Sequence, residues 1–142
     1  MKTSEKGIDL IKKYEGFVPT AYRCSADKWT IGYGHTLNVK STDVITLDEA
    51  ERFLKQDIEL AEKEVNRHNL DINQNQFDAL VSFVFNLGGG SFARSTLLKK
   101  IKSNPNDPTI RKEFERWIYA GGVALKGLAR RREEEANLYF TK

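Results

Sequence analysis

Apolar residues recur at helical spacing over most of the chain. Residues 4–15 place Ile8 and Ile11 on one face, and a longer amphipathic pattern begins near position 47. Residues that repeat every three or four positions are typical of helices that bury one face. We therefore predict a first helix over residues 4–15 and a long helix over about 47–68. One face of the long helix comprises Ala50, Phe53, Leu54, Asp57, Ala61 and Val65.

Capping signals mark the starts of two helices. Thr46 stands three residues before Glu49, and Asn73 stands three residues before Gln76. In such capping boxes each side chain accepts a hydrogen bond from the backbone amide of the other residue. The helix after Asn73 is apolar nearly all round, which predicts a buried position at the centre of a helical lobe, and Gly88 should end it. Further helices are expected over residues 91–102, from Asp107 and Pro108 to about Ile118, and from about Leu128.

Residues 16–45 have a different pattern. Over residues 29–36 bulky and small side chains alternate, as in a strand with two different faces. One face carries Gly32 and Gly34, and glycines leave a strand open where a ligand must approach the backbone. Pro19 and a polar run over residues 38–43 mark turns. We therefore expect a small antiparallel sheet in this segment.

These elements predict a mainly helical α+β fold in a single domain, residues 1–142. A small sheet lobe would occupy about residues 16–45, and the helix over 47–68 would link it to a larger helical lobe. That lobe would comprise residues 70–142 together with the N-terminal helix. A chain of 142 residues is long enough to bury a sizeable core in one domain.

Glu15 is the first candidate for chemistry. It continues the face of Ile8 and Ile11, and Gly16 follows where the helix is expected to end. A carboxylate that continues an apolar stripe is partly desolvated, which favours its protonated form and suits a general acid. The alternative is a solvated charge at a helix end. The turn that follows carries three short polar or nucleophilic side chains, Cys24, Ser25 and Asp27.

The spacing of three residues resembles a known catalytic signature. Eight residues separate Glu15 from Cys24, and five separate Cys24 from Thr30. This spacing, with the run Thr-Ile-Gly-Tyr-Gly-His-Thr that begins at Thr30, resembles the signature of phage-type lysozymes, glycoside hydrolase family 24. The resemblance covers nearly the whole chain in the right order. The matching segments are 15–16, 21–22, 30–36, 73–80, 85–88 and 117–135.

The resemblance implies an endolysin with a two-lobed, lysozyme-like fold. Such an enzyme hydrolyses the β-1,4 bond between N-acetylmuramic acid and N-acetylglucosamine in bacterial peptidoglycan, and it lyses the host cell. Glu15 would be the catalytic acid, and Cys24 would take the second catalytic position, where many members have Asp. Thr30 would hold a water molecule or steady that second group through its hydroxyl. Gly32 and His35 are candidates for substrate binding on the open strand.

Arg131 and Arg132 are candidates for structural support of the site. They share a helical face with Leu128 and Leu138, so at least one of them should point inward. The resemblance implies that an arginine here pairs with the acid near the first helix. The competing interpretation of the charged run over residues 130–135 is a solvated helix face with internal ion pairs.

Several roles stay open at this point. Cys24 is a nucleophile, a base for water, or a bystander while Asp27 supplies the charge. His35 is either a general base or a hydrogen-bonded structural residue, and His68 is expected to be exposed at a helix end. Two other functions compete with hydrolysis. One is a non-catalytic peptidoglycan-binding module, which would have lost the acid, and the other is a lytic transglycosylase, which needs the acid but no second group.

Composition and charge limit the partners. The net charge of +3, from 23 basic and 20 acidic residues, favours an anionic cell wall but is too weak to indicate nucleic acid. No apolar run approaches the roughly 20 residues that span a bilayer, and no apolar core of a signal peptide follows residues 1–6. We expect a monomer without stable membrane insertion, and the resemblance to phage-type lysozymes implies that it is held in the host cytoplasm until a holin pore releases it to the cell wall. The single cysteine excludes an internal disulfide and has no metal-ligand spacing to the two histidines, so no cofactor is expected.

Overall fold

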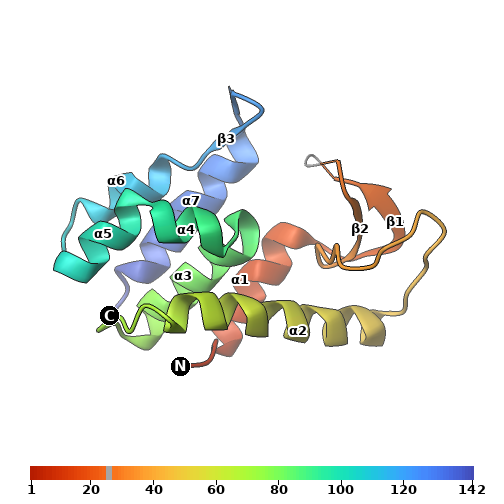
Figure 1. Ribbon diagram of the computed structural model, residues 1–142, viewed down its shortest axis with the longest axis horizontal. Coiled ribbons are helices and arrows are strands. Elements are labelled where there is room, and N and C mark those ends of the chain that lie inside the picture. The colour runs from red at the N-terminus through yellow and green to blue at the C-terminus, as the bar shows by residue number, and fades with distance from the viewer. Residues whose placement is uncertain (25–26) are drawn as a thin grey trace.

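The computed structural model describes residues 1–24 and 27–142 (Figure 1). Within these ranges the chain forms seven helices and four short strands, which confirms the predicted mainly helical α+β fold. The helices are α1 Glu5–Glu15, α2 Leu47–Asn66, α3 Gln74–Leu87, α4 Gly89–Arg94, α5 Thr96–Ser103, α6 Ile110–Glu115 and α7 Lys126–Tyr139. The strands are β1 Val18–Arg23, β2 Trp29–Gly32, β3 Tyr119–Ala120 and β4 Val123–Ala124. Of the helices in the described ranges, none is both long and apolar enough to cross a membrane.

The small lobe is built on the antiparallel pair of β1 and β2. Val18 pairs with Gly32 and Tyr22 pairs with Thr30, with a shift of register between Val18 and Tyr22. In Figure 1 this sheet stands at one end of α2, apart from the helices of the larger lobe. The small antiparallel sheet predicted from the alternating pattern is therefore present.

α2 connects the two lobes. The Thr46 hydroxyl accepts a hydrogen bond from the Glu49 amide, and the Glu49 carboxylate accepts one from the Thr46 amide, both at 3.2 Å. The predicted capping box is therefore confirmed, and the helix begins where expected. It ends at Asn66, slightly before the expected end near residue 68. Its buried stripe holds Ala50, Leu54, Ile58, Ala61, Glu62 and Val65.

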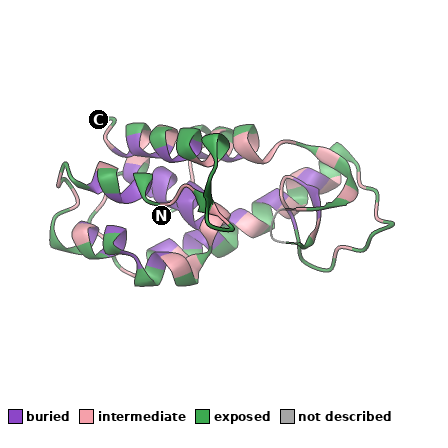
Figure 2. Ribbon diagram, turned by 90° about the horizontal axis from the view of Figure 1, so that it is seen from above, coloured by how far each residue is buried: buried purple, intermediate pink, exposed green. Residues whose placement is uncertain are grey.

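α3 forms the centre of the helical lobe. Every residue from 76 to 84 is buried, and the helix packs against α1, α2 and α7. Figure 2 shows the buried residues turned inward between the helices. Phe83 packs edge-on against Phe92, Phe114 and Trp117, with ring centroids 6.1, 5.8 and 5.7 Å apart. The burial predicted from the all-round apolar pattern is confirmed.

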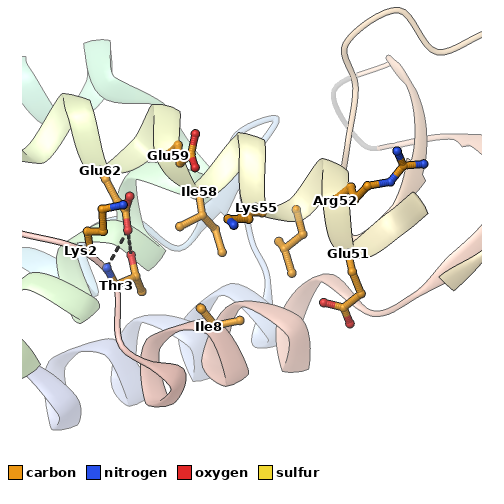
Figure 3. Close-up of a pocket in the computed structure, with 10 residues that line it drawn as sticks. Lys2, Thr3, Ile8, Glu51, Arg52, Lys55, Ile58, Glu59 and Glu62 are labelled. Atoms are coloured by element: carbon orange, nitrogen blue, oxygen red, sulfur yellow. Dashed lines mark hydrogen bonds between the residues drawn. The ribbon is translucent and has the colours of Figure 1, made fainter. Parts of the chain in front are cut away.

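The N-terminal residues fix the start of α1 against two other helices. The Thr3 amide and hydroxyl both donate to Glu62 Oε2 of α2, at 2.6 and 2.7 Å (Figure 3). The Ser4 amide donates to Asp78 Oδ1 of α3 at 3.0 Å. Both carboxylates are buried, so these bonds satisfy them as well as the helix start. α1, which carries Glu15 at its other end, is thereby held in register with the core.

The segment expected as one helix over residues 91–102 is two helices, so that prediction is wrong. Ser95 is extended, with ψ of 150°, and its hydroxyl accepts a hydrogen bond from the Leu98 amide at 3.0 Å. A serine in this role starts a new helix, because it satisfies an amide that has no partner in the preceding turn. Gly88, with φ of 90°, does end α3, but Gly89 already belongs to α4.

A β-hairpin replaces the end of the predicted helix that begins near Pro108. The Asp107 carboxylate accepts hydrogen bonds from the Thr109 amide and hydroxyl, at 2.9 and 2.7 Å, and this turn delays the start of α6 to Ile110. The helix ends at Glu115, and β3 and β4 then pair across Gly121–Gly122. Both glycines have positive φ, 58° and 80°, as a tight hairpin turn requires. Figure 1 shows this hairpin projecting from the helical lobe.

Candidate active site

Glu15 lies at the last position of α1, where the chain turns towards the small lobe. Gly16 has φ of 66° and ends the helix, as predicted. The Glu15 side chain is 17% exposed, so the carboxylate is partly desolvated without being sealed off. Gly34 lies directly against it, because a Cβ atom at Gly34 would overlap Oε1 of Glu15. Gly34 therefore has to be glycine for the carboxylate to sit where it does.

Arg131 holds the other oxygen of the same carboxylate. Its Nη1 donates to Glu15 Oε2 at 2.5 Å, and its side chain is only 4% exposed. Both Arg131 and Arg132 are buried, so the inward orientation expected from the helical face is present, and the solvated-face interpretation does not hold for these two residues. The structure places Arg131, and not Arg132, against the acid.

Arg132 belongs to a second layer of buried polar contacts. Its Nε donates to the Trp117 carbonyl at 2.9 Å, and its two terminal nitrogens donate to Glu135 and Asn86. Burial lowers the pKa of Arg132, and the neighbouring Glu135 carboxylate opposes that shift. Arg132 thus ties α7 to the end of α3 and to the segment that leads into the β3–β4 hairpin.

Cys24 and Thr30 lie at the ends of the two paired strands. Cys24 is half-buried, its amide donates to the Lys28 carbonyl at 3.0 Å, and its carbonyl accepts from the Asp27 amide at 2.9 Å. Thr30 is buried, and its hydroxyl donates to the same Lys28 carbonyl at 3.0 Å. The turn therefore orders both residues through one backbone oxygen. Asp27 is exposed and pairs with Arg23 at 3.3 Å, whereas Ser25 lies outside the described residues.

Tyr22 is a site residue that the sequence reasoning did not single out. It pairs directly with Thr30 across the sheet, and Cys24 follows it two positions later, just after the end of β1. Burial raises the pKa of Tyr22, and the charges of Glu15 and Cys24 add to this shift. The phenol therefore lies within the electrostatic reach of both proposed catalytic groups. Alternation along β1 is the signal that would have found it.

His35 and Gly32 have structural contacts. His35 is buried, its Nδ1 lies 2.7 Å from Asp57 Oδ2, and its ring stacks on Phe53 with centroids 4.4 Å apart. The geometry favours the hydrogen-bonded structural residue over the general base. A Cβ atom at Gly32 would lie 3.1 Å from the Ile45 side chain and 3.2 Å from that of Ala50, so this glycine lets β2 approach α2. Substrate contact by Gly32 and His35 stays a prediction.

His68 is not exposed as expected. It is half-buried, and its ring packs edge-on against Phe92 with centroids 5.5 Å apart. Its buried Nε2 has no hydrogen-bond partner among the described residues. Burial lowers the pKa of His68, with further lowering from Lys102 and Arg67. The short turn after α2 folds this ring back onto the core, which local sequence does not reveal.

A cleft of about 590 Å³ lies between the two lobes. Gly34 is part of its wall and also touches Glu15, so the carboxylate lies at the edge of the cleft. A cleft of this size can hold part of a ligand that consists of several sugar rings. It is lined by Lys28, Gly34, Thr36, Leu37, Asn38, Asp57, Leu60, Ala61, Glu64, Val84, Phe85, Gly88 and Gly89.

A second hollow of about 430 Å³ runs along α1 and α2 near the N-terminus (Figure 3). Its floor is Ile8, Leu54 and Ile58, and Glu15, Cys24 and Thr30 are not among its lining residues. These three residues do not line the interlobe cleft either, but its wall residue Gly34 touches the Glu15 carboxylate, which makes this cleft the candidate active site. In the described ranges, no three His, Cys, Asp or Glu side chains are grouped to hold a metal ion.

Comparisons with known proteins agree with this geometry. The family model for phage lysozyme matches residues 12–135. An endolysin of Acyrthosiphon pisum secondary endosymbiont phage 1 is 43% identical, and the alignment covers 98% of each chain. The muramidase domain of SpmX from Asticcacaulis excentricus superposes with a TM-score of 0.89 at 33% identity, over 99% of each chain. An endolysin of Escherichia coli O157:H7 phage FAHEc1 superposes with a TM-score of 0.85 at 35% identity, over 99% of this chain and 94% of that one.

The fold, the cleft and the order of the matched segments all lead to one family. The predicted resemblance to phage-type lysozymes is confirmed by the family match and by relatives that span the whole chain. The chain therefore belongs to the phage lysozyme family, and it is a peptidoglycan-hydrolysing glycosidase of the endolysin type.

Proposed function

We propose that the chain cleaves the β-1,4 bond between N-acetylmuramic acid and N-acetylglucosamine, with Glu15 as the proton donor. The observation that carries this proposal is the placement of the Glu15 carboxylate. Oε2 is held by Arg131, and Oε1 lies against Gly34 at the wall of the interlobe cleft. Arg131 fixes one oxygen, and the other would donate the proton to a glycosidic oxygen that enters from the cleft.

Hydrolysis of a glycoside requires a proton for the leaving oxygen and a second group on the other side of the sugar. Glu15 would donate its proton to that oxygen as the bond to the anomeric carbon breaks. The carboxylate left behind is negative, and Arg131 stabilises it by an ion pair already formed in the free enzyme.

We propose Cys24 as the second group. It follows β1 directly, and the nearby residues Tyr22 on β1 and Thr30 on β2 pair with each other across the sheet. An ordinary cysteine thiol is only a few per cent thiolate at pH 7, but the thiolate is intrinsically very nucleophilic. Cys24 would therefore attack the anomeric carbon or activate a water molecule. Thr30 would steady this group or its water.

The cellular setting is part of the proposal. We propose that the protein acts as a monomeric single domain on peptidoglycan, without nucleic acid or membrane insertion. Its lobes would be residues 16–45 and residues 70–142 together with the N-terminal helix, joined by α2. It would stay in the host cytoplasm until a holin pore releases it to the wall. The endolysin relatives support this setting.

Digestion of purified peptidoglycan, followed by mass analysis of the fragments, tests the reaction. Hydrolysis after N-acetylmuramic acid gives fragments with reducing muramic acid ends. A lytic transglycosylase would give anhydro ends that are lighter by one water, and a binding module would give no fragments. Either of these two results would contradict the proposed function.

A further inference from the structure

A buried ionic cluster lies behind the catalytic acid. Arg131 divides its guanidinium between three acceptors: Nη1 donates to Glu15, Nε donates to Glu135 Oε2 at 3.3 Å, and Nη2 donates to the Ser82 carbonyl at 3.1 Å. The Ser82 hydroxyl also donates to Glu135 Oε2, at 2.5 Å. Arg132 donates to the other oxygen of Glu135. Glu135 and Arg132 are fully buried.

The charges of this cluster balance only when Glu15 is ionised. Two arginines then face two carboxylates, and each buried charge has a partner. When Glu15 carries the proton that it donates in the reaction, the cluster has one excess positive charge. The affinity of Glu15 for its proton therefore depends on how much of the positive charge of Arg131 is offset elsewhere. Glu135 is the group that offsets it.

We propose that Glu135 is a positioning residue that sets the pH range in which Glu15 can donate its proton. It does so by holding one edge of the Arg131 guanidinium while Arg132 and Ser82 hold Glu135 itself. The proposal rests on the proposed role of Glu15. Glu135 is fully buried, and its hydrogen bonds in the described residues go to Ser82, Arg131 and Arg132, so it acts on Glu15 through Arg131.

The two tyrosines near Glu15 stay uncharged in the relevant range. The Tyr14 ring lies 5.7 Å from the Arg131 guanidinium, and burial together with Glu134 raises the pKa of Tyr14 to about 12. The pKa of Tyr22 is raised as well, by burial and then by the charges of Glu15 and Cys24. Both phenols are therefore neutral between pH 4 and 9. Arg132 is linked to the acid through Glu135 and Arg131, so a charge change in the second layer can act on Glu15.

Variants that remove charges of opposite sign test the proposal. Glu135→Gln removes a negative charge, favours ionised Glu15, and should move the high-pH limb of activity to lower pH by about one unit. Arg132→Gln removes a positive charge and should move that limb to higher pH. The double variant should return it close to the wild-type position. Glu133→Gln is the matched control, because it removes the same charge from an exposed position of α7 and should leave the limb unchanged.

The ionisation of Glu15 should also be followed directly, by carboxyl carbon NMR of glutamate-labelled protein with the Glu15 signal assigned from Glu15→Gln. If its titration midpoint moves as described while the activity limb does not, the role of Glu135 is supported and the role of Glu15 as acid fails. Equal midpoints in Glu135→Gln and Glu133→Gln would overturn the proposal. Shifts of the Glu15 midpoint in the same direction in Glu135→Gln and Arg132→Gln would also overturn it. General structural damage would move the midpoint the same way whichever charge is removed.

Ser82→Ala serves if the charge variants do not fold. It removes only the hydroxyl that donates to Glu135 Oε2, so Glu135 would draw more of the Arg131 charge. The Glu15 midpoint should then rise by a few tenths of a unit, in the direction of Arg132→Gln. An unchanged midpoint in folded Ser82→Ala would overturn the proposal.

Discussion

Arg131 and Glu15 are 116 positions apart in the sequence, and they form an ion pair of 2.5 Å at the edge of the interlobe cleft. The pair joins the last helix to the first, and it holds the oxygen of Glu15 that faces away from Gly34. It has two consequences. The position of the acid depends on the packing of α7, and the removal of either partner leaves a charge without its counterpart.

Arg131→Leu should therefore destabilise the protein by roughly 3 kcal/mol, because it leaves Glu15 and Glu135 without the guanidinium between them. Activity should fall as well, because the carboxylate loses its anchor. Arg130→Leu is the control, since Arg130 is exposed and should change the free energy of unfolding by less than about 0.5 kcal/mol. Urea unfolding of the two variants checks this. Equal effects at the two positions would contradict the assigned role of Arg131.

Gly34→Ala should reduce activity roughly 100-fold, because its Cβ atom would displace the Glu15 carboxylate from the cleft wall. Its positive φ of 73° should add a stability cost of about 1 kcal/mol. Gly121→Ala is a matched control, since Gly121 has φ of 58° but a Cβ atom there would meet nothing within 4 Å. Gly121→Ala should lower the melting temperature, because of the backbone strain at positive φ, and should keep its activity on peptidoglycan. Comparable loss of activity in both variants would exclude the contact as the cause.

The half-buried His68 should make stability depend on pH. Its pKa in the folded state is lowered from the ordinary value of about 6.5, so the unfolded state binds the proton more readily. The neutral ring therefore contributes to the free energy of unfolding above pH 6.5, and this contribution is lost as pH falls through the pKa of His68 in the folded state. His68→Leu should lose less stability than wild type between pH 7.5 and 5. Chemical unfolding at several pH values measures this, and parallel curves for the two proteins would refute it.

Local signals in the sequence were sufficient to predict the capped ends of the helices. The Thr46 and Asn73 capping boxes and the glycine after Glu15 predicted helix ends correctly, because these interactions lie within one turn. The β3–β4 hairpin was missed, since Gly121–Gly122 is equally consistent with a helix stop and with a turn of positive φ.

Contacts distant in sequence were harder to predict. The helical face showed that Arg131 or Arg132 should point inward but not which of the two would meet the acid, and nothing in the sequence indicated that Gly34 touches Glu15. The side of Tyr22 follows from strand alternation, but its partner Thr30 depends on the register of the sheet. These relations arise from packing between elements, so the spacing of residues within one element does not encode them.

Two substitutions distinguish a catalytic role of the Cys24 thiol from that of a bystander. Cys24→Ser should be at least about 10-fold slower than wild type, because a hydroxyl is a far weaker base and nucleophile at neutral pH. Cys24→Asp should keep substantial activity and lose part of its dependence on alkaline pH, because a carboxylate is ionised well below the range of a thiol. Initial rates across pH measure both effects. If Cys24→Ser keeps the wild-type rate and pH profile, the thiol is a bystander, and Asp27 is the next residue to replace.

Glu15→Gln in the peptidoglycan assay tests the central claim most directly. The variant keeps the size of the side chain but has no acidic proton, so the rate at which reducing ends appear should fall at least about 100-fold. Circular dichroism should show the wild-type helix content, which separates lost chemistry from lost fold. The account predicts a folded protein with almost no release of muramic acid ends. A folded Glu15→Gln variant that retains more than about a tenth of the wild-type rate would contradict it.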